Sequence, residues 1–317
     1  MKEKKKFKKR LNLGGISRSK YYEYQDKAFN YFALGCTLFG VFILIYLMYN
    51  ILYAGLGRID WNFITNGPAP RAAATGIYTA LLGTLWVMVI TAFVAFPIGI
   101  CAAVYLEEYA KKGHLSNMLE INIANLAGVP SIIYGLLGLQ VFSRIFGFGN
   151  SVLTGGLTLA LLILPVIIVS TREALKTVPY SIREASYALG ASKWQTIWKQ
   201  VLPASIAGVF TGVILSLSRA IGETAPLIVI GAVTFVSNVP GGPYEGITPE
   251  TGGQLWHGLF DEFTVLPIQI FNWSSRPQEG FKVVNSAAAI IVLLSITFIM
   301  NGIAVYLRHR WQKKIKW

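Results

Sequence analysis

Two opposite charges lie inside an apolar stretch that is long enough to cross a membrane. Between residues 200 and 244 the only charged side chains are Arg219 and Glu223. A charge at the centre of a bilayer costs at least about 2.5–3.5 kcal/mol, so it faces protein or a water-filled path. Four residues apart on a helix, the two side chains share a face and form a pair. The pair therefore marks a place where something polar crosses the membrane.

Five further runs without charged residues indicate additional membrane spans. Each is longer than the ~20 residues that a helix needs to cross the hydrocarbon, and 54% of the chain is hydrophobic. Backbone groups in lipid must be satisfied within their own segment, so such runs are helical. We predict an all-α integral membrane protein with six transmembrane helices, near residues 28–54, 74–106, 119–142, 152–172, 203–236 and 283–307.

The distribution of Lys and Arg predicts the orientation. The segments 1–27, 107–118, 172–200 and 308–317 hold 22 of the 28 basic residues, and the segments on the opposite side hold five. Because basic loops stay in the cytoplasm, we expect both termini there. A basic tail is also found in nucleic-acid-binding proteins. Here the charges flank spans and no folded domain accompanies them, so we expect no nucleic-acid partner.

The longest connection on the opposite side is the loop 237–282. It is rich in Gly and Pro and carries a net negative charge. Apolar residues at mixed spacing within 254–273 lead us to expect a short helix at the membrane surface. The loop is either a solvated cap over the bundle or a docking surface for an external partner.

The span that holds the charged pair has two other features. Gly208 and Gly212 are four residues apart, a pattern that brings membrane helices close together. Pro226 lies three residues after Glu223 and predicts a bend or break beside the charged pair.

The cytoplasmic segment 172–202 is predicted to form two short helices parallel to the membrane. Ser181 and Glu184 fit a capping box for the first helix, and Gly190 fits its left-handed end. Ser192 fits the cap of the second helix, which carries two tryptophans one turn apart. Such a unit is either a stiff lever for a cytoplasmic partner or an interfacial connector anchored by tryptophan.

Catalytic signatures are absent from the sequence. There is no phosphate-binding G-x-x-x-x-G-K-[ST] loop, no zinc-ligand spacing and no disulfide framework. Cys36 and Cys101 fall in apolar spans, where small buried packing is the usual role. We expect no catalytic residue and no metal site. A membrane-embedded enzyme needs several titratable groups at one depth, and the spans supply only Arg219 and Glu223.

The segment 172–202 resembles the EAA loop of ABC-importer permeases, whose pattern is E-A-A-x3-G-x9-I-x-L-P. The match begins at Glu184-Ala185-Ser186 and ends at Gln200-Val201-Leu202-Pro203, with Ser186 and Gln200 as departures. The resemblance implies a coupling helix that sits in a groove of an ATPase subunit. The residues it implies for ATPase coupling are Glu184, Ala185, Gly190, Ala191, Leu202 and Pro203.

Four other motifs resemble the permeases of phosphate-specific ABC importers, the PstA family. They are R-A-x-G-E-T-A-P at residues 219–226 and the segments 105–109, 127–135 and 266–271, and the similarity covers about 76–308. It implies a type I ABC permease architecture. The expected parts are a basic tail (1–27), a first helix and external loop (28–73), a permease core (74–308) with the loops 172–202 and 237–282, and a cytoplasmic C-terminus (309–317).

By this resemblance, the chain is a transmembrane permease subunit for inorganic phosphate, with no cofactor of its own. The implied partners are a related second permease, an ATPase dimer that binds ATP and Mg²⁺, an extracytoplasmic phosphate-binding protein and membrane lipid. The implied location is the inner membrane of a prokaryotic cell. Permeases for sulfate or molybdate share the coupling loop and stay as the alternative, followed by a stand-alone carrier, although no internal repeat is visible.

The resemblance also suggests roles for the charged pair. The guanidinium of Arg219 offers a fork of donors that suits phosphate oxygens. Glu223 would neutralise Arg219 between substrates or accept a hydrogen bond from protonated phosphate, and Thr224 and Ser218 would add hydroxyl contacts. The alternative is a permanent ion pair that only fixes helix packing.

Overall fold

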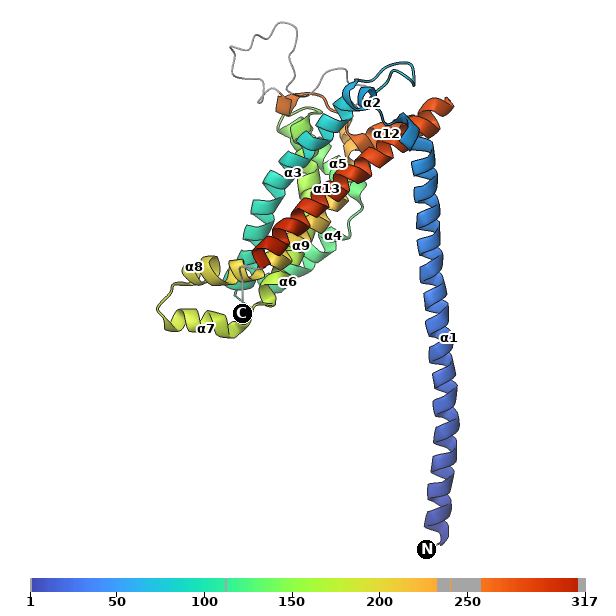
Figure 1. Ribbon diagram of the computed structural model, residues 1–317. Coiled ribbons are helices and arrows are strands. Elements are labelled where there is room, and N and C mark those ends of the chain that lie inside the picture. Colours follow the sequence, from blue (N-terminus) through green and yellow to red (C-terminus); the bar gives the residue numbers. More distant parts are fainter. Residues whose placement is uncertain (1, 112, 233–239, 241–257, 313–317) are drawn as a thin grey trace. The chain divides into compact units, whose positions relative to one another are not determined.

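The computed structural model describes residues 2–111, 113–232, 240 and 258–312, and nearly all of them are helical (Figure 1). The chain divides into two units, Met1–Tyr53 and Ala54–Trp317. The first half of the described elements comprises α1 (Lys2–Gly55), η1 (Leu56–Arg58), α2 (Trp61–Thr65), α3 (Tyr78–Val104), η2 (Tyr105–Tyr109), α4 (His114–Ala127), α5 (Ser131–Gly138) and η3 (Leu139–Ile145). The second half comprises α6 (Val152–Lys176), α7 (Tyr180–Ala188), α8 (Lys193–Thr196), η4 (Ile197–Val201), α9 (Leu202–Ile221), α10 (Ala225–Ile230), α12 (Leu266–Ser274), η5 (Gly280–Asn285) and α13 (Ser286–Gln312).

Among the described residues, five helical segments are long and apolar enough to cross a membrane, and counting one bent pair of helices as a span gives the predicted number of six. In the first unit, α1 begins at Lys2, so the basic tail and the first span belong to one continuous helix. The boundaries of the first span are therefore set by the apolar run and not by a helix start.

The third span, predicted near 119–142, is not one continuous helix. It consists of α4 and α5, which are bent by 101° at the break between them. Pro130 causes the break, because it lacks the N–H that would bond to the carbonyl of Leu126. The N–H of Val129 (3.1 Å) and the phenol of Tyr134 (2.8 Å) donate to that carbonyl instead. A hydropathy pattern counts apolar residues and does not register this lost hydrogen bond.

The fifth span also ends earlier than predicted. α9 ends at Ile221, and α10 starts at Ala225 with Pro226 in its first turn. The break predicted beside Glu223 is confirmed, and the N–H of Glu223 donates to the carbonyl of Ala220 at 3.2 Å. The last residues of the predicted span, 233–236, lie outside the described part of the chain.

The core of the second unit forms around α6, which packs between α3 and α9 (Figure 1). The predicted close approach at Gly208 and Gly212 is confirmed. A Cβ on Gly208 would lie 2.6 Å from the Cβ of Ala174, and a Cβ on Gly212 would overlap the side chain of Ser170. Small residues therefore let the backbone of α9 approach α6 closely.

A short helix, α12, is present within the expected segment 254–273; it packs one side against the core and leaves Phe271 57% exposed. Its position at the membrane surface stays a prediction. The N–H of Leu266 donates to the hydroxyl of Thr84 on α3 at 2.9 Å. Trp273 is buried between the rings of Phe63 and Phe281, with centroid distances of 6.2 and 6.1 Å. The apolar residues of the loop thus extend the core, and residues 254–257 lie outside the described residues.

Candidate functional site

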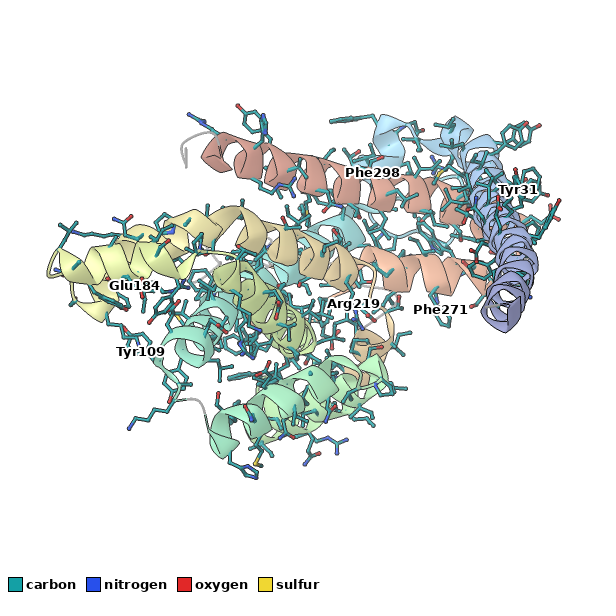
Figure 2. All side chains as sticks on the ribbon, turned by 90° about the horizontal axis from the view of Figure 1, so that it is seen from below. Tyr31, Tyr109, Glu184, Arg219, Phe271 and Phe298 are labelled. Carbon is teal, nitrogen blue, oxygen red and sulfur yellow. The ribbon has the colours of Figure 1, made fainter. Side chains whose placement is uncertain are left out.

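The charged pair lies where α9 gives way to the break before α10. The Nε atom of Arg219 is 3.4 Å from Oε1 of Glu223, so the i,i+4 pairing predicted for these residues is confirmed. The side chain of Arg219 is 48% exposed in this chain and that of Glu223 is 19% exposed. Figure 2 shows Arg219 near the middle of the bundle rather than at its rim. The long contact and the exposure leave the guanidinium accessible to a competing anion.

The hydroxyl residues beside the pair differ in their surroundings. Thr224 begins the turn into α10 and is half-buried, and its side chain forms no capping bond there. The Ser218 hydroxyl lies 2.8 Å from the carbonyl of Ile214 and 2.6 Å from Oδ1 of Asn301 on α13. Ser218 therefore joins α9 to α13, whereas Thr224 follows Glu223 directly in the break. Asn301 was not among the predicted site residues, although an amide inside an apolar span was a visible signal.

The segment between α6 and α9 forms the two short helices that were predicted, α7 and α8. They lie side by side beyond one end of the bundle (Figure 1). Gly190 ends the turn after α7 with φ +81°. Ser192 caps α8 in a complete capping box with Gln195. The predicted cap at Ser181 is wrong, because α7 already starts at Tyr180, one residue earlier.

The start of α7 is set by Pro179, which occupies the N-cap position and makes no side-chain bond. A proline fixes the backbone angle before the first turn, so a serine two residues later falls inside the helix. Glu184 is consequently not held in a capping box and stays exposed, as do Ala185 and Gly190.

The structure gathers the residues expected for ATPase coupling in two places. Glu184, Ala185, Gly190 and Ala191 belong to the projecting loop, and Leu202 and Pro203 lie at its base, where α9 begins. Leu189, which was not predicted, is 90% exposed at the tip between α7 and Gly190. Leu189 lines a groove of about 510 Å³ between α7 and α8, together with Ala185, Gly190 and Ala191.

Arg183 holds the projecting loop against the membrane helices. Its Nη2 and Nε donate to Oε1 of Glu108 at 2.6 and 3.1 Å, and both side chains are less than 10% exposed. Its remaining donors reach the carbonyls of Val178 (2.8 Å) and Leu175 (3.2 Å). The pair was missed in the sequence because its members are separated by 75 residues.

The pKa of the neighbouring Tyr187 is affected by the same two charges, Glu108 and Arg183. Burial raises the pKa of its phenol, and the nearby carboxylate of Glu108 and the phenol of Tyr180 raise it further, while the guanidinium of Arg183 opposes the shift. The phenol stays neutral at physiological pH, so it adds no charge beside the buried Arg183–Glu108 pair.

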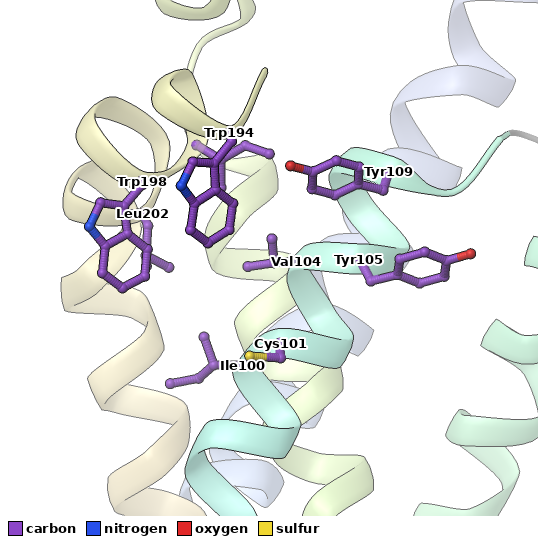
Figure 3. A pocket seen from close by; sticks show the side chains of 9 residues that line it. Ile100, Cys101, Val104, Tyr105, Tyr109, Trp194, Trp198 and Leu202 are labelled. Atoms are coloured by element: carbon purple, nitrogen blue, oxygen red, sulfur yellow. The ribbon is translucent and has the colours of Figure 1, made fainter. Parts of the chain in front are cut away.

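An apolar groove of about 330 Å³ separates the end of α3 from α8 and η4 (Figure 3). The rings of Trp194 and Trp198 stack on one wall with centroids 5.6 Å apart, and Cys101 is exposed on the other. The buried packing expected for the two cysteines is wrong, because Cys36 is exposed as well. The groove is lined by Ile100, Cys101, Val104, Tyr105, Tyr109, Trp194, Ile197, Trp198 and Leu202.

Acidic, histidine and cysteine side chains do not converge on a metal site anywhere in the described residues. The arrangement offers a partly exposed guanidinium beside a helix break and two short helices that project from the bundle.

Comparisons with known proteins agree with this geometry. Residues 95–313 match the family of binding-protein-dependent transport system inner membrane components. Phosphate transport system permease protein PstA 1 of Mycobacterium tuberculosis is 33% identical over 80% of this chain and 79% of its own length. PstA of Yersinia pestis is 31% identical over 86% of this chain and 85% of its length. The probable ABC transporter permease protein YqgI of Bacillus subtilis is 28% identical over 83% and 88%.

A solved structure supports the fold. The inward-facing MetNI methionine ABC transporter contains a chain that superimposes with a TM-score of 0.54, covering 72% of this chain and 93% of that one. The sequence identity of 18% limits the similarity to the arrangement of the helices.

Proposed function

The chain belongs to the family of binding-protein-dependent transport system inner membrane components and, within it, to the PstA permeases, and we propose that it is the membrane subunit through which an ATP-driven importer passes inorganic phosphate. The observation that carries this proposal is the accessible Arg219–Glu223 pair at a helix break inside the membrane-spanning region. We take phosphate as the anion that this pair binds, because the similar proteins are named as phosphate transport permeases.

Arg219 is the residue that binds the passing anion. Its guanidinium is planar and permanently charged, so its donors match two phosphate oxygens at once. Glu223 holds the guanidinium when no phosphate is present and is displaced from it when phosphate arrives. Thr224, beside Glu223 in the break, donates its hydroxyl to the same path. A passage site must also release its substrate, so tight selection belongs to the external binding protein.

The energy for transport comes from partner subunits. The sequence holds no phosphate-binding loop for ATP, so an ATPase dimer binds ATP and Mg²⁺ and pushes on α7 and α8. A related second permease completes the path. Nucleotide drives the movement only through its different affinity for the two states of the assembly. The exposed Glu184, Ala185 and Leu189 form the contact with the ATPase.

The chain lies in the inner membrane of a prokaryotic cell, and the excess of basic residues on one side favours an orientation with both termini in the cytoplasm. Under this orientation the end of α12 faces outward and α7 faces inward. Ser275 is exposed immediately after α12, and Tyr180 is 67% exposed at the start of α7.

Cysteine labelling tests the orientation in cells. With Cys36 and Cys101 replaced by serine, Ser275→Cys is expected to react with an impermeant maleimide from outside intact cells. Tyr180→Cys, the control at the other end of the bundle, is expected to react only after the membrane is opened. The reverse pattern of labelling would overturn the orientation.

Uptake of radiolabelled phosphate tests the function. In cells that lack this chain but contain its partners, restoring it is expected to restore energy-dependent uptake that unlabelled phosphate blocks and that sulfate and molybdate leave unchanged. Block by sulfate or molybdate would keep the permease assignment but move the substrate to another oxyanion. No restored uptake of any of the three ions would contradict the transport proposal itself.

A further inference from the structure

The turn that directly follows α3, η2, carries two adjacent carboxylates that bind two different arginines. Glu108 binds Arg183 of α7, with a shortest distance of 2.6 Å. Glu107 binds Arg172 of α6 at 3.4 Å. This turn, η2, has π-helical hydrogen bonding, and such turns recur at functional positions in helices. The wider turn lets neighbouring residues point toward two separate elements.

The contact through Arg183 joins three elements through one side chain. Its donors bind the carboxylate of Glu108 on η2 and the carbonyls of Leu175 and Val178 at and after the end of α6. The carbonyl of Leu175 also accepts from the N–H groups of Thr177 and Val178, so the guanidinium adds a further bond to a helix end that the backbone already caps. Because a guanidinium is planar and rigid, these bonds fix the direction of α7 as well as its distance.

The contact through Arg172 extends the connection to the bent third span. Besides Glu107, its guanidinium binds Glu120 of α4 at 3.2 Å. α4 leads through its bend into α5, and Gly135 of α5 packs directly on Pro226 of α10. Pro226 follows Glu223 by three residues. A continuous series of contacts thus runs from the projecting loop to the charged pair.

A buried ion pair contributes little net stability to a fold, because both charges lose their contact with water. At a buried position, apolar residues of similar volume stabilise the folded state as well as a buried ion pair does, or better. The pair between Glu108 and Arg183 is buried, whereas the nearby pair between Glu173 and Lys176 is exposed and local. What the buried pair supplies, and apolar contact does not, is a fixed direction between the loop and the ends of two spans, α3 and α6.

We propose that Glu107 and Glu108 are positioning residues that make α7 move as one body with α3, α4 and α6, so that displacement of the loop reaches Arg219 and Glu223. Glu108 transmits the movement from the loop, and Glu107 passes it to α4 through Arg172. This inference rests on the proposed function, because it assumes that an ATPase pushes on α7.

The ratio of phosphate transported to ATP hydrolysed tests the inference in the purified, reconstituted complex. Glu108→Gln is expected to leave assembly and ATP hydrolysis in place and to lower this ratio at least about tenfold, because the hydrogen bonds from Arg183 lose their charged acceptor. Glu107→Gln is expected to lower it as well. Glu173→Gln removes an exposed carboxylate of the same region and is expected to keep the wild-type ratio.

If Glu108→Gln does not assemble, the same ratio measured in a more conservative variant tests the inference. Arg183→Lys keeps the charge for Glu108 but lacks the fork that also reaches the carbonyls of Leu175 and Val178. It is expected to assemble and to transport less phosphate per ATP. An assembled Glu108→Gln or Arg183→Lys complex with the wild-type ratio would overturn the inference and leave the proposed function intact. A wild-type complex that hydrolyses ATP without moving phosphate would instead contradict the proposed function.

Discussion

Arg219→Gln is expected to abolish ATP-driven phosphate uptake while the complex still assembles. The guanidinium is half-exposed and bound to Glu223 by one long contact, so packing does not depend on it. Losing one hydrogen bond to a charged group costs roughly 1.5–3 kcal/mol, equivalent to about 10- to 150-fold in rate or affinity. Glutamine also leaves the negative charge of Glu223 in the path, where it repels phosphate. Initial rates of uptake and the amount of assembled complex are the two measurements.

A second arginine provides the control for the loss of charge. Arg144 is exposed in η3, and Arg144→Gln is expected to transport at the wild-type rate. Arg219→Lys separates charge from geometry, because lysine keeps the charge without the fork of donors. We expect it to retain a small part of the uptake. If Arg219→Gln prevents assembly, the pair is a structural element that fixes helix packing, and the role in phosphate passage is contradicted.

Gly190→Val is expected to separate ATP hydrolysis from transport. The backbone at Gly190 has φ +81°, a conformation that costs a residue with a side chain roughly 1–2 kcal/mol. A Cβ at this position meets no atom within 4 Å, so the effect comes from the backbone and not from a clash. The β-branched side chain turns the chain out of the left-handed region and changes the direction of α8 relative to α7. Phosphate uptake per ATP hydrolysed is expected to fall several-fold at unchanged expression.

Asparagine is the matched control for this substitution. It adopts the left-handed conformation more readily than other residues with a side chain, so Gly190→Asn is expected to keep most of the coupling. Equal uptake per ATP in Gly190→Val and wild type would remove α7 and α8 from the coupling mechanism.

Hydropathy and local signals predicted the parts of the fold that depend on neighbouring residues. The apolar runs gave the spans because a lipid-exposed backbone has to bond within its own helix. The left-handed turn at Gly190 and the cap at Ser192 followed from the requirements of single backbone positions. The i,i+4 pairing of Arg219 with Glu223 was predicted for the same reason, since both side chains lie on one helical turn.

Features that depend on distant residues were not accessible in the same way. The burial of α12 requires Thr84 and Phe63, which belong to other segments of the chain. The buried ion pair between Arg183 and Glu108 joins residues that are 75 positions apart in the sequence. The bend of the third span depends instead on a local residue, because Pro130 lies within the motif at residues 127–135. Hydropathy alone does not distinguish a proline that breaks the helix from the apolar residues around it.

The same distinction applies to the candidate site. The sequence motif located Arg219 and Glu223, but it predicted the same role for Ser218 and Thr224. In the structure Ser218 bonds to Asn301 of α13, whereas Thr224 lies in the break. Neighbouring positions on a helix point in directions about 100° apart. Their partners therefore depend on which helices pack around them.

The most direct test of the central claim is ATP-driven uptake of phosphate by proteoliposomes that contain this chain, its second permease, the ATPase and the binding protein. With ATP on the ATPase side, labelled phosphate is expected to accumulate above its external concentration, and excess sulfate or molybdate is expected to leave the rate unchanged. Omitting this chain is expected to stop accumulation. ATP hydrolysis without accumulation by the complete complex, or accumulation that persists without this chain, would contradict the account.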